Sequence, residues 1–369
     1  MPLFLVPLLL LNVRCQTMPA IKPVEHVKEY MVPTADGWDI AVSRLYREKY
    51  ISAAGKKRIP VLLCHTLRVN DFIWELGAGK SLAAYLANNG YDVWMFSFRG
   101  SGKSREAAPR SGAAPRPDIS TDDLIREDLA AVVNLVVKET NSEKVILVGH
   151  GLGAAVCAVY AGRDSGNRVA SLVAIAPMLV NFYKSGIMQK VGGADCPLST
   201  PDNRTFRLIA GDIVRTDRYV PSDDASFETL FFNRNNMESA QVFGLYSFAV
   251  DVTPKGLIAA YRELIDTGVL PSETMDYLNE AKKIRCPTLV ISGLADNAAP
   301  PETARHFYKT LTAVEKELVE CCRANGYKCD YGHLDLVAGA GAPQEVYPSI
   351  LKWIKKTDGA VKGASAKVQ

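Results

Sequence analysis

Residues Lys144–Ala155, with the sequence KVILVGHGLGAA, decide how this chain folds. The apolar residues Val145–Val148 predict a buried strand, and the small residues in Gly149–Gly153 permit a tight turn into the helix predicted over Ala154–Gly162. A strand that turns sharply into a helix is the unit from which parallel sheets with covering helices are built. We therefore expect an α/β fold around this segment.

Short apolar runs alternate with helical patterns on both sides of this turn. The predicted strands are 27–32, 39–45, 59–64, 91–98, 144–148, 169–176 and 287–293, of which the first two form a hairpin. The predicted helices are 81–89, 121–139, 154–162 and 344–356. This order predicts a mostly parallel central sheet with helices on both faces.

An inserted segment divides the predicted core. Residues 24–179 form the first part of the core, and residues 277–356 form the second part. Residues 180–276 have an irregular pattern with many aromatic side chains, which favours a lid or cap inserted between two strands. The tail 357–369 is rich in Gly, Ala, Lys and Ser, and we expect it to be disordered.

The N-terminal residues leave the compartment open between two alternatives. Leu3–Leu11 is apolar like the centre of a secretion signal, but no Lys or Arg precedes it and Met18 provides a second start. If residues 1–17 are a signal peptide, the protein is secreted or endomembrane, and otherwise it is cytoplasmic. Only an oxidising compartment would allow a disulfide among the late cysteines, which are Cys321, Cys322 and Cys329.

The composition excludes several classes of protein. Of 369 residues, 48% are hydrophobic and 22% charged, which is not typical of disordered, collagen-like or coiled-coil chains. The net charge of +3 is too small for a surface that binds nucleic acid. The chain lacks a basic amphipathic stretch, which argues against strong attachment to a membrane surface, and we expect no stable membrane insertion. It also lacks a CxxC pair, so we expect no metal site. We expect a small apolar molecule as the partner, whereas the oligomeric state cannot be inferred.

Three glycine-rich turns partly match nucleotide-binding motifs. Gly77–Ser81 and Gly100–Ser104 end like a phosphate-binding loop, but the first glycine of that motif would fall on Trp74 and on Ser97. The turn at 149–154 matches a dinucleotide-binding turn, but it lies far into the chain and no acidic residue ends the next strand. We expect no cofactor.

The same turn has the spacing G-x-S-x-G of a nucleophile elbow, with Gly151 at the central position. Further motifs follow other predicted strands, in the order His65–Leu67, Arg99–Ser104, Ser292–Asp296 and Tyr331–Asp335. In these motifs the chain resembles the α/β-hydrolase superfamily, and more narrowly its lipase-like, polyester-synthase-like group. The resemblance covers residues 30–356 and implies the α/β-hydrolase fold with an inserted lid.

The resemblance also implies roles for individual residues. Asp296 corresponds to the acid of the catalytic triad and His333 to its general base. The backbone N–H groups of Leu67 and Leu152 correspond to the oxyanion-hole donors. Gly151 holds the position of the nucleophile but has no side chain to form an acyl-enzyme. The implied site is therefore a His–Asp dyad with no side-chain nucleophile at the elbow.

The chain departs from the family at a second position, where Thr66 replaces the usual glycine and crowds the oxyanion loop. We expect the space left by the missing side chain of Gly151 to suit a water molecule. Cys157 is not a substitute nucleophile, because it lies in the following helix and should face the core. Ser101 and Ser104 lie on a neighbouring loop with no reason to reach the general base.

Each acidic or histidine residue also has a structural interpretation. His150 is expected to pack beside the elbow, and Asp335 to support the histidine loop through hydrogen bonds. Asp296 alone could cap a helix before Pro300, and His333 alone could be a surface histidine. The two together favour a catalytic pair.

Three functions remain open. The first is an enzyme that acts on an apolar ester-like or lactone-like carbonyl compound, with His333 activating water or a substrate proton. The second is a non-catalytic protein of this fold that binds an apolar ligand. The third is an esterase, lipase or acyltransferase whose Ser or Cys nucleophile has been replaced by Gly151.

Overall fold

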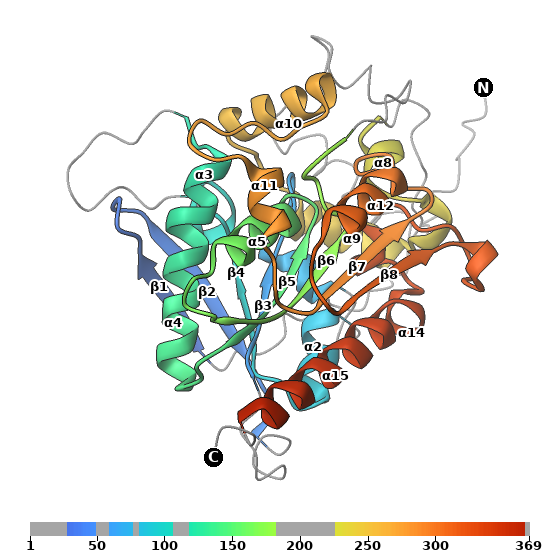
Figure 1. Cartoon of the computed structure of the whole chain (residues 1–369). Helices are drawn as coiled ribbons and strands as arrows, with labels where there is room; N and C mark the ends of the chain where they lie inside the picture. Colours follow the sequence, from blue (N-terminus) through green and yellow to red (C-terminus); the bar gives the residue numbers. More distant parts are fainter. Residues whose placement is uncertain (1–27, 49–58, 77–80, 106–117, 182–225, 366–369) are drawn as a thin grey trace, which may run out of the picture.

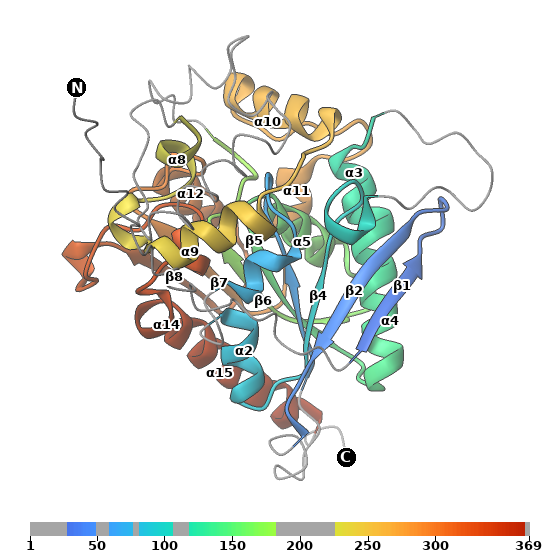
Figure 2. The ribbon, with the colours of Figure 1, turned by 180° about the vertical axis from the view of Figure 1, so that it is seen from behind.

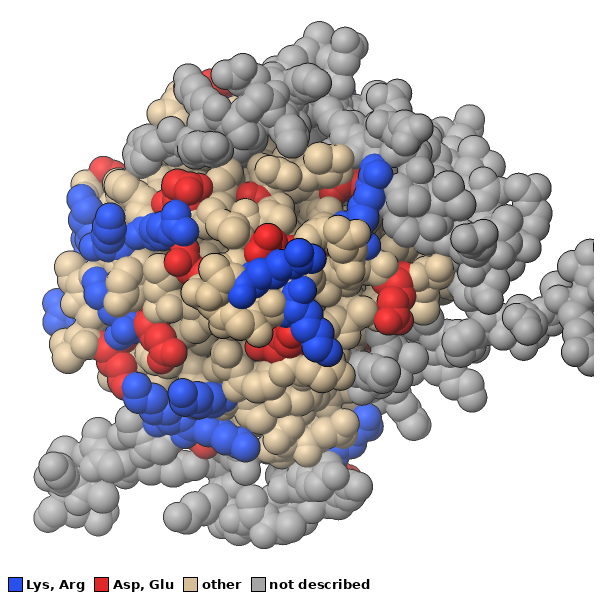
Figure 3. Space-filling model, turned by 90° about the vertical axis from the view of Figure 1, so that its right-hand side faces the viewer, with Lys and Arg blue, Asp and Glu red and all other residues tan. Residues whose placement is uncertain are grey.

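The structure is a computed structural model that describes residues 28–48, 59–76, 81–105, 118–181 and 226–365. The segment 1–17, considered above as a signal peptide, lies outside the described residues. Among the described residues, no helix is both long and apolar enough to cross a membrane. On the face of the molecule in Figure 3, positive and negative side chains are interspersed among uncharged ones.

A central sheet of eight strands organises the chain, in the order β1-β2-β4-β3-β5-β6-β7-β8 (Figure 1). The pairings β1–β2 and β2–β4 are antiparallel, and the others are parallel. The strands are β1 Lys28–Pro33, β2 Asp39–Leu45, β3 Val61–Cys64, β4 Val93–Phe96, β5 Val145–His150, β6 Val169–Ile175, β7 Thr288–Gly293 and β8 Lys316–Cys321. The prediction of a mostly parallel sheet is confirmed.

Helices cover both faces of the sheet, as the alternating sequence pattern predicts. On one face lie α2 Leu82–Asn88 and α15 Tyr347–Ser365, which contact each other (Figure 2). The other face is covered by α4 Ala130–Thr140, α5 Leu152–Arg163, α11 Tyr277–Lys282 and α12 Pro301–Thr310 (Figure 1). Because both faces are covered, strands β3 to β7 are buried throughout, which explains their continuous apolar runs.

The remaining helical elements lie mostly in connections. They are η1 Asp71–Glu75, η2 Gly102–Ser104, α3 Thr121–Asp123, η3 Leu124–Leu129, α8 Ser226–Phe231, η4 Arg234–Asn236, α9 Ser239–Gly244, η5 Leu245–Ala249, α10 Lys255–Thr267, η6 Arg323–Asn325, α13 Asp335–Ala338 and α14 Ala342–Glu345. The helix predicted over 121–139 is formed by α3, η3 and α4 in succession.

The segment expected as a lid, 180–276, is inserted between β6 and β7. Its base is closed where Val180 pairs with Val269, and residues 182–225 lie outside the described residues. Its described part contacts the core loops: Val69 pairs with Val250, and the Leu334 N–H donates to the Phe231 carbonyl at 2.6 Å. This part of the insertion therefore supports the loops at one edge of the sheet.

Two features differ from the sequence prediction. Strand β8 was not predicted, because its sequence KELVEC is neither continuously apolar nor strictly alternating, as suits a partly exposed sheet edge. Helix α15 continues to Ser365, whereas the helix predicted from the sequence ends at residue 356. The helix is anchored by buried Trp353 and Ile354, and extending an anchored helix through residues such as Ala and Lys is favourable.

Candidate active site

The turn between β5 and α5 has the backbone geometry of a nucleophile elbow. Gly151 has φ +54° and ψ −116°, in the left-handed range of φ that favours glycine. Its neighbours must also be small, since a Cβ on Gly149 would lie 2.6 Å from Ala154 Cα, and one on Gly153 would overlap the Cys64 carbonyl oxygen. The sequence therefore selects glycine at each of these positions because the strand reverses tightly against its neighbour.

His333 and Asp296 meet at the same edge of the sheet as this turn. Asp296 follows β7, and His333 lies between β8 and α13. His333 Nδ1 lies 2.8 Å from Asp296 Oδ2, and both side chains are fully buried. The other oxygen, Asp296 Oδ1, accepts hydrogen bonds from the N–H groups of Ala298 at 2.9 Å and Ala299 at 2.7 Å. Asp296 thus both orders the turn before α12 and contacts the imidazole.

This contact assigns the tautomer of His333. A carboxylate accepts hydrogen bonds, so the neutral imidazole carries its proton on Nδ1 and donates it to Asp296. Nε2 is then unprotonated and faces the elbow. A Cβ built on Gly151 would lie 2.7 Å from this nitrogen. The arrangement can therefore accept a proton from a group that lies beside Gly151.

Hydrogen bonds to Asp335 support the histidine loop, as the sequence predicts. Its carboxylate accepts from the N–H groups of Gly332 and Asn233, each at 3.0 Å, and from Asn236 Nδ2 at 3.1 Å. Burial raises the pKa of Asp335 to about 6. Asn233 and Asn236 come from the described part of the insertion, which thereby holds the loop that carries His333.

His150 packs against the dyad, in agreement with the structural interpretation of this residue. Its ring stacks on that of His333 with centroids 4.4 Å apart, and its Nε2 donates to the His333 carbonyl at 3.2 Å. Burial, together with the charge that His333 can carry, lowers the pKa of His150 well below its ordinary value. His150 is therefore neutral and positions the ring of His333.

Thr66 lies in the space where a side chain at the elbow would begin. A Cβ on Gly151 would overlap Thr66 Oγ1, which itself lies 3.2 Å from His333 Nε2. The Leu152 N–H donates to the same hydroxyl oxygen at 3.3 Å. The water-sized space expected beside Gly151 is therefore filled by the Thr66 hydroxyl. Sequence reasoning treated Thr66 only as crowding and did not place its hydroxyl beside Gly151.

His65 holds the backbone of Thr66 in place. Its Nε2 accepts a hydrogen bond from the Phe98 N–H at 3.1 Å, so its proton is on Nδ1, which donates to the Thr66 carbonyl at 2.8 Å. Ser101 Oγ lies 3.3 Å from the same Nε2. Burial lowers the pKa of His65, which keeps the ring neutral.

The other polar residues considered as nucleophiles are engaged elsewhere. Ser101 contacts His65 as described, and Ser104 Oγ donates to the Ser97 carbonyl at 2.6 Å. Cys157 is fully buried in α5 beside Cys64, as predicted. Cys321, Cys322 and Cys329 are free thiols. Within the described residues, no group of His, Cys, Asp and Glu side chains is arranged to hold a metal ion.

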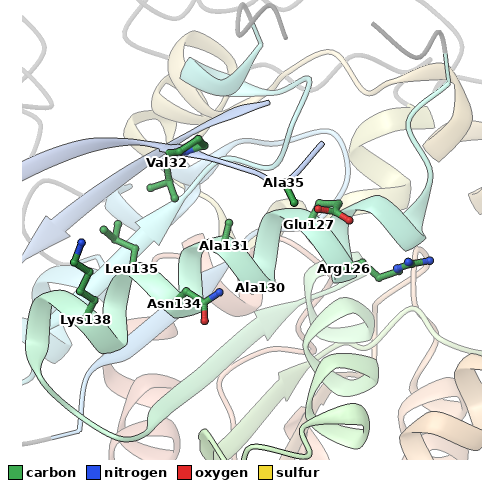
Figure 4. Close-up of a pocket in the computed structure, with 10 residues that line it drawn as sticks. Val32, Ala35, Arg126, Glu127, Ala130, Ala131, Asn134, Leu135 and Lys138 are labelled. Carbon is green, nitrogen blue, oxygen red and sulfur yellow. The ribbon is translucent and has the colours of Figure 1, made fainter. Parts of the chain in front are cut away.

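The two residues expected as oxyanion donors border one cavity. Leu67 and Leu152 line a space of about 20 Å³ together with His65, Thr66 and Phe98. The loop is held from the insertion by a hydrogen bond from the Arg68 N–H to Thr253 Oγ1 at 3.1 Å. A larger hollow of about 380 Å³ lies elsewhere, between β1 and the η3–α4 helix, where Val32 faces Ala131 and Leu135 (Figure 4). It contains neither member of the dyad.

Comparison with known proteins places the chain in a family. Residues 59–327 match the model of the alpha/beta hydrolase fold. The chain is 30% identical to human lipase member N, over 89% of this chain and 87% of that protein. It is also 30% identical to human gastric triacylglycerol lipase, over 89% of this chain and 88% of that protein.

Solved structures agree at the level of the fold. A thermophilic esterase from Thermogutta terrifontis superimposes with a TM-score of 0.55 at 18% identity, covering 90% of this chain and 99% of the esterase. A bacterial membrane phospholipase A superimposes with a TM-score of 0.57 at 17% identity, covering 89% and 86%. The chain belongs to the α/β-hydrolase family, among the relatives of the gastric lipases.

Proposed function

We propose that this protein hydrolyses esters of apolar acyl compounds, with His333 and Asp296 acting as the general-base pair. The observation that carries the proposal is the buried 2.8 Å contact between the two side chains, with His333 Nε2 turned toward the elbow. A histidine oriented in this way removes a proton from an attacking hydroxyl and returns it to the leaving alcohol.

The surroundings favour this chemistry over a purely structural pair. Both side chains are excluded from water, so the imidazolium that forms during the reaction interacts strongly with the adjacent carboxylate. In the proposal, the N–H groups of Leu67 and Leu152 stabilise the negative charge that develops on the carbonyl oxygen. No side chain at position 151 takes part, because Gly151 has none.

The class of substrate is inferred from the relatives. Two 30% identical proteins are a gastric triacylglycerol lipase and lipase member N, and both align over nearly the whole chain. We infer that this protein acts on uncharged esters with apolar acyl chains. A lactone is an internal ester, and the same steps would open it.

Hydrolysis of p-nitrophenyl esters with short to long acyl chains tests the proposal. We expect turnover by the wild-type protein and a fall of at least about 100-fold in kcat for His333→Ala, because removing a general base costs this much. The kcat of Asp296→Asn should also fall, since the amide no longer selects the same tautomer of His333. The control is His306→Ala, which removes a histidine of α12 outside the dyad. Equal turnover by wild type and His333→Ala would refute the proposal.

A wild-type protein that binds these esters without turnover would instead support the non-catalytic alternative. That alternative has one observation in its favour, because Thr66 Oγ1 accepts the Leu152 N–H that would serve the oxyanion. Binding of an uncleavable ether analogue, measured by fluorescence, identifies the non-catalytic function only when the matching ester is not turned over.

A further inference from the structure

We propose that the hydroxyl of Thr66 is the nucleophile of this site, supplied from the loop after β3 instead of from the elbow. The inference rests on the proposed ester hydrolysis and names the group that attacks. It assigns a function to the threonine that fills the space beside Gly151.

The first step of the argument is the direction of the hydroxyl proton. Leu152 N–H donates to Thr66 Oγ1, so this oxygen acts as an acceptor toward Leu152. The proton of the hydroxyl is then available to His333 Nε2 at 3.2 Å, which is unprotonated because Nδ1 donates to Asp296. A thioether, Met178 Sδ, lies 4.0 Å from Oγ1 and is a much weaker acceptor.

The second step is the comparison with a serine-based triad. In that arrangement a hydroxyl contacts the histidine, the histidine contacts a buried acid, and an oxyanion-hole N–H lies beside the hydroxyl. Thr66, His333 and Asp296 reproduce these contacts, with Leu152 as the adjacent N–H donor. Threonine is an established nucleophile when a base is placed beside it.

The third step is the rigidity of the loop that carries the hydroxyl. His65 anchors the Thr66 carbonyl at 2.8 Å, and Thr253 anchors the next peptide through the Arg68 N–H at 3.1 Å. The Thr66 side chain is β-branched, which limits its rotamers, and only 2% of its surface is exposed. The hydroxyl is therefore held against the base before any substrate arrives.

The reaction balances without any other reagent. Thr66 Oγ1 bonds to the ester carbonyl carbon while its proton passes to His333 Nε2. The bond to the alcohol oxygen then breaks, and the alcohol leaves with that proton, so Thr66 carries the acyl group. A water molecule gives a proton to His333 and attacks the acyl carbon, and Thr66 leaves and regains a proton. The net change is ester plus water to acid plus alcohol, with no oxidation or reduction.

Labelling with an alkyl p-nitrophenyl phosphonate tests the assignment independently of turnover. The nucleophile displaces p-nitrophenolate and keeps the phosphonyl group, which peptide mass spectrometry locates. We expect the label on Thr66 of the full-length protein, and its absence from Thr66→Val, which keeps the shape but removes the hydroxyl. We also expect at least about 100-fold lower kcat in this variant, as for loss of a triad member. Thr140→Val is the matched control, because it removes a buried hydroxyl from α4 away from the site.

Each outcome bears on a different proposal. If Thr66→Val keeps turnover while His333→Ala loses it, ester hydrolysis stands and water, not Thr66, is the nucleophile. If wild type is labelled on Thr66 but turns over no ester, the nucleophile stands and the hydrolase function fails. If wild type takes no label on Thr66, the assignment is wrong. If Thr66→Val does not fold, Thr66→Ser keeps the assignment testable, because it retains a hydroxyl and should fold and accept the label at position 66.

Discussion

The hydroxyl oxygen of Thr66 occupies the position from which a side chain on Gly151 would extend toward His333. A side chain at position 151 and the Thr66 hydroxyl therefore cannot occupy this space together. A serine at the elbow requires a small residue on the facing loop, and a threonine on that loop requires glycine at the elbow. The hydroxyl beside His333 thus comes from the loop after β3, and not from the turn after the neighbouring strand β5.

This exclusion predicts that restoring a serine at the elbow alone will fail. In Gly151→Ser the new Cβ overlaps Thr66 Oγ1, so the free energy of unfolding should fall by about 1–3 kcal/mol, as for overpacked cores. The double variant Gly151→Ser with Thr66→Gly should regain part of that stability and take the phosphonate label at position 151; the rest stays lost because the backbone φ of +54° still strains a serine. Urea unfolding of the four proteins in this cycle measures the coupling.

Gly151→Ala serves as the control, because it introduces the same overlap without a hydroxyl. It should be destabilised like the single serine variant and should gain no new label. Additive effects in the double variant would show that the two positions do not interact.

The position of the Thr66 hydroxyl could not be predicted from the sequence, although the pairing of Asp296 with His333 could. Asp296 and His333 were assigned from the motifs Ser292–Asp296 and Tyr331–Asp335, in which the chain resembles the α/β-hydrolases. Thr66 was noticed as a departure from the family. Its contact with His333 spans 267 residues and depends on the direction of one side chain, which no local pattern encodes.

In the fold, too, some elements are predictable from the sequence and others are not. Buried strands such as β3 and β5 were predicted because both faces are apolar, whereas the edge strand β8 mixes charged and apolar residues without a regular period and gives a weaker signal. The roles of His65 depend on contacts with Phe98 and Thr66 from different loops. Such contacts are set by tertiary structure and not by local propensity.

His65 is predicted to be a positioning residue. His65→Phe removes the donor to the Thr66 carbonyl and the acceptor for the Phe98 N–H, so Oγ1 is held less firmly against His333. We expect kcat to fall by about 10–100-fold with little change in KM, because the effect falls on the attacking group rather than on substrate binding. His65→Gln retains a donor and an acceptor and should recover part of kcat. A change confined to KM would contradict this role.

Because His150 is buried, the free energy of unfolding should depend on pH. Its pKa is held well below the ordinary value of 6.5 in the fold, so below pH 6.5 the unfolded chain binds a proton that the folded protein does not. Stability attributable to His150 therefore falls as the pH falls, by on the order of 1 kcal/mol between pH 7.5 and pH 5.5. In His150→Phe, which keeps an aromatic ring against His333, this loss should be absent.

The comparison is made by urea unfolding of both proteins at pH 7.5 and 5.5. Other shifted groups, such as Asp335 with its raised pKa, contribute in both proteins, so the difference isolates His150. Identical pH dependence would mean that His150 is protonated in the folded state.

Arg99 lies on the loop that supports His65. Its guanidinium Nε donates to Asp128 at 2.7 Å, its backbone N–H donates to the same carboxylate at 2.9 Å, and Nη1 donates to Asp36 at 2.6 Å. Arg99→Met leaves Asp128 buried without its cation and should lower the free energy of unfolding by about 3–5 kcal/mol at pH 8.

Burial already raises the pKa of Asp128 to about 6, and loss of Arg99 raises it further. The folded variant then binds more protons than the unfolded chain, so the cost should shrink as the pH falls from 8 to 6. Adding Asp128→Asn should remove most of this pH dependence, and a cost independent of pH in the single variant would contradict the assignment.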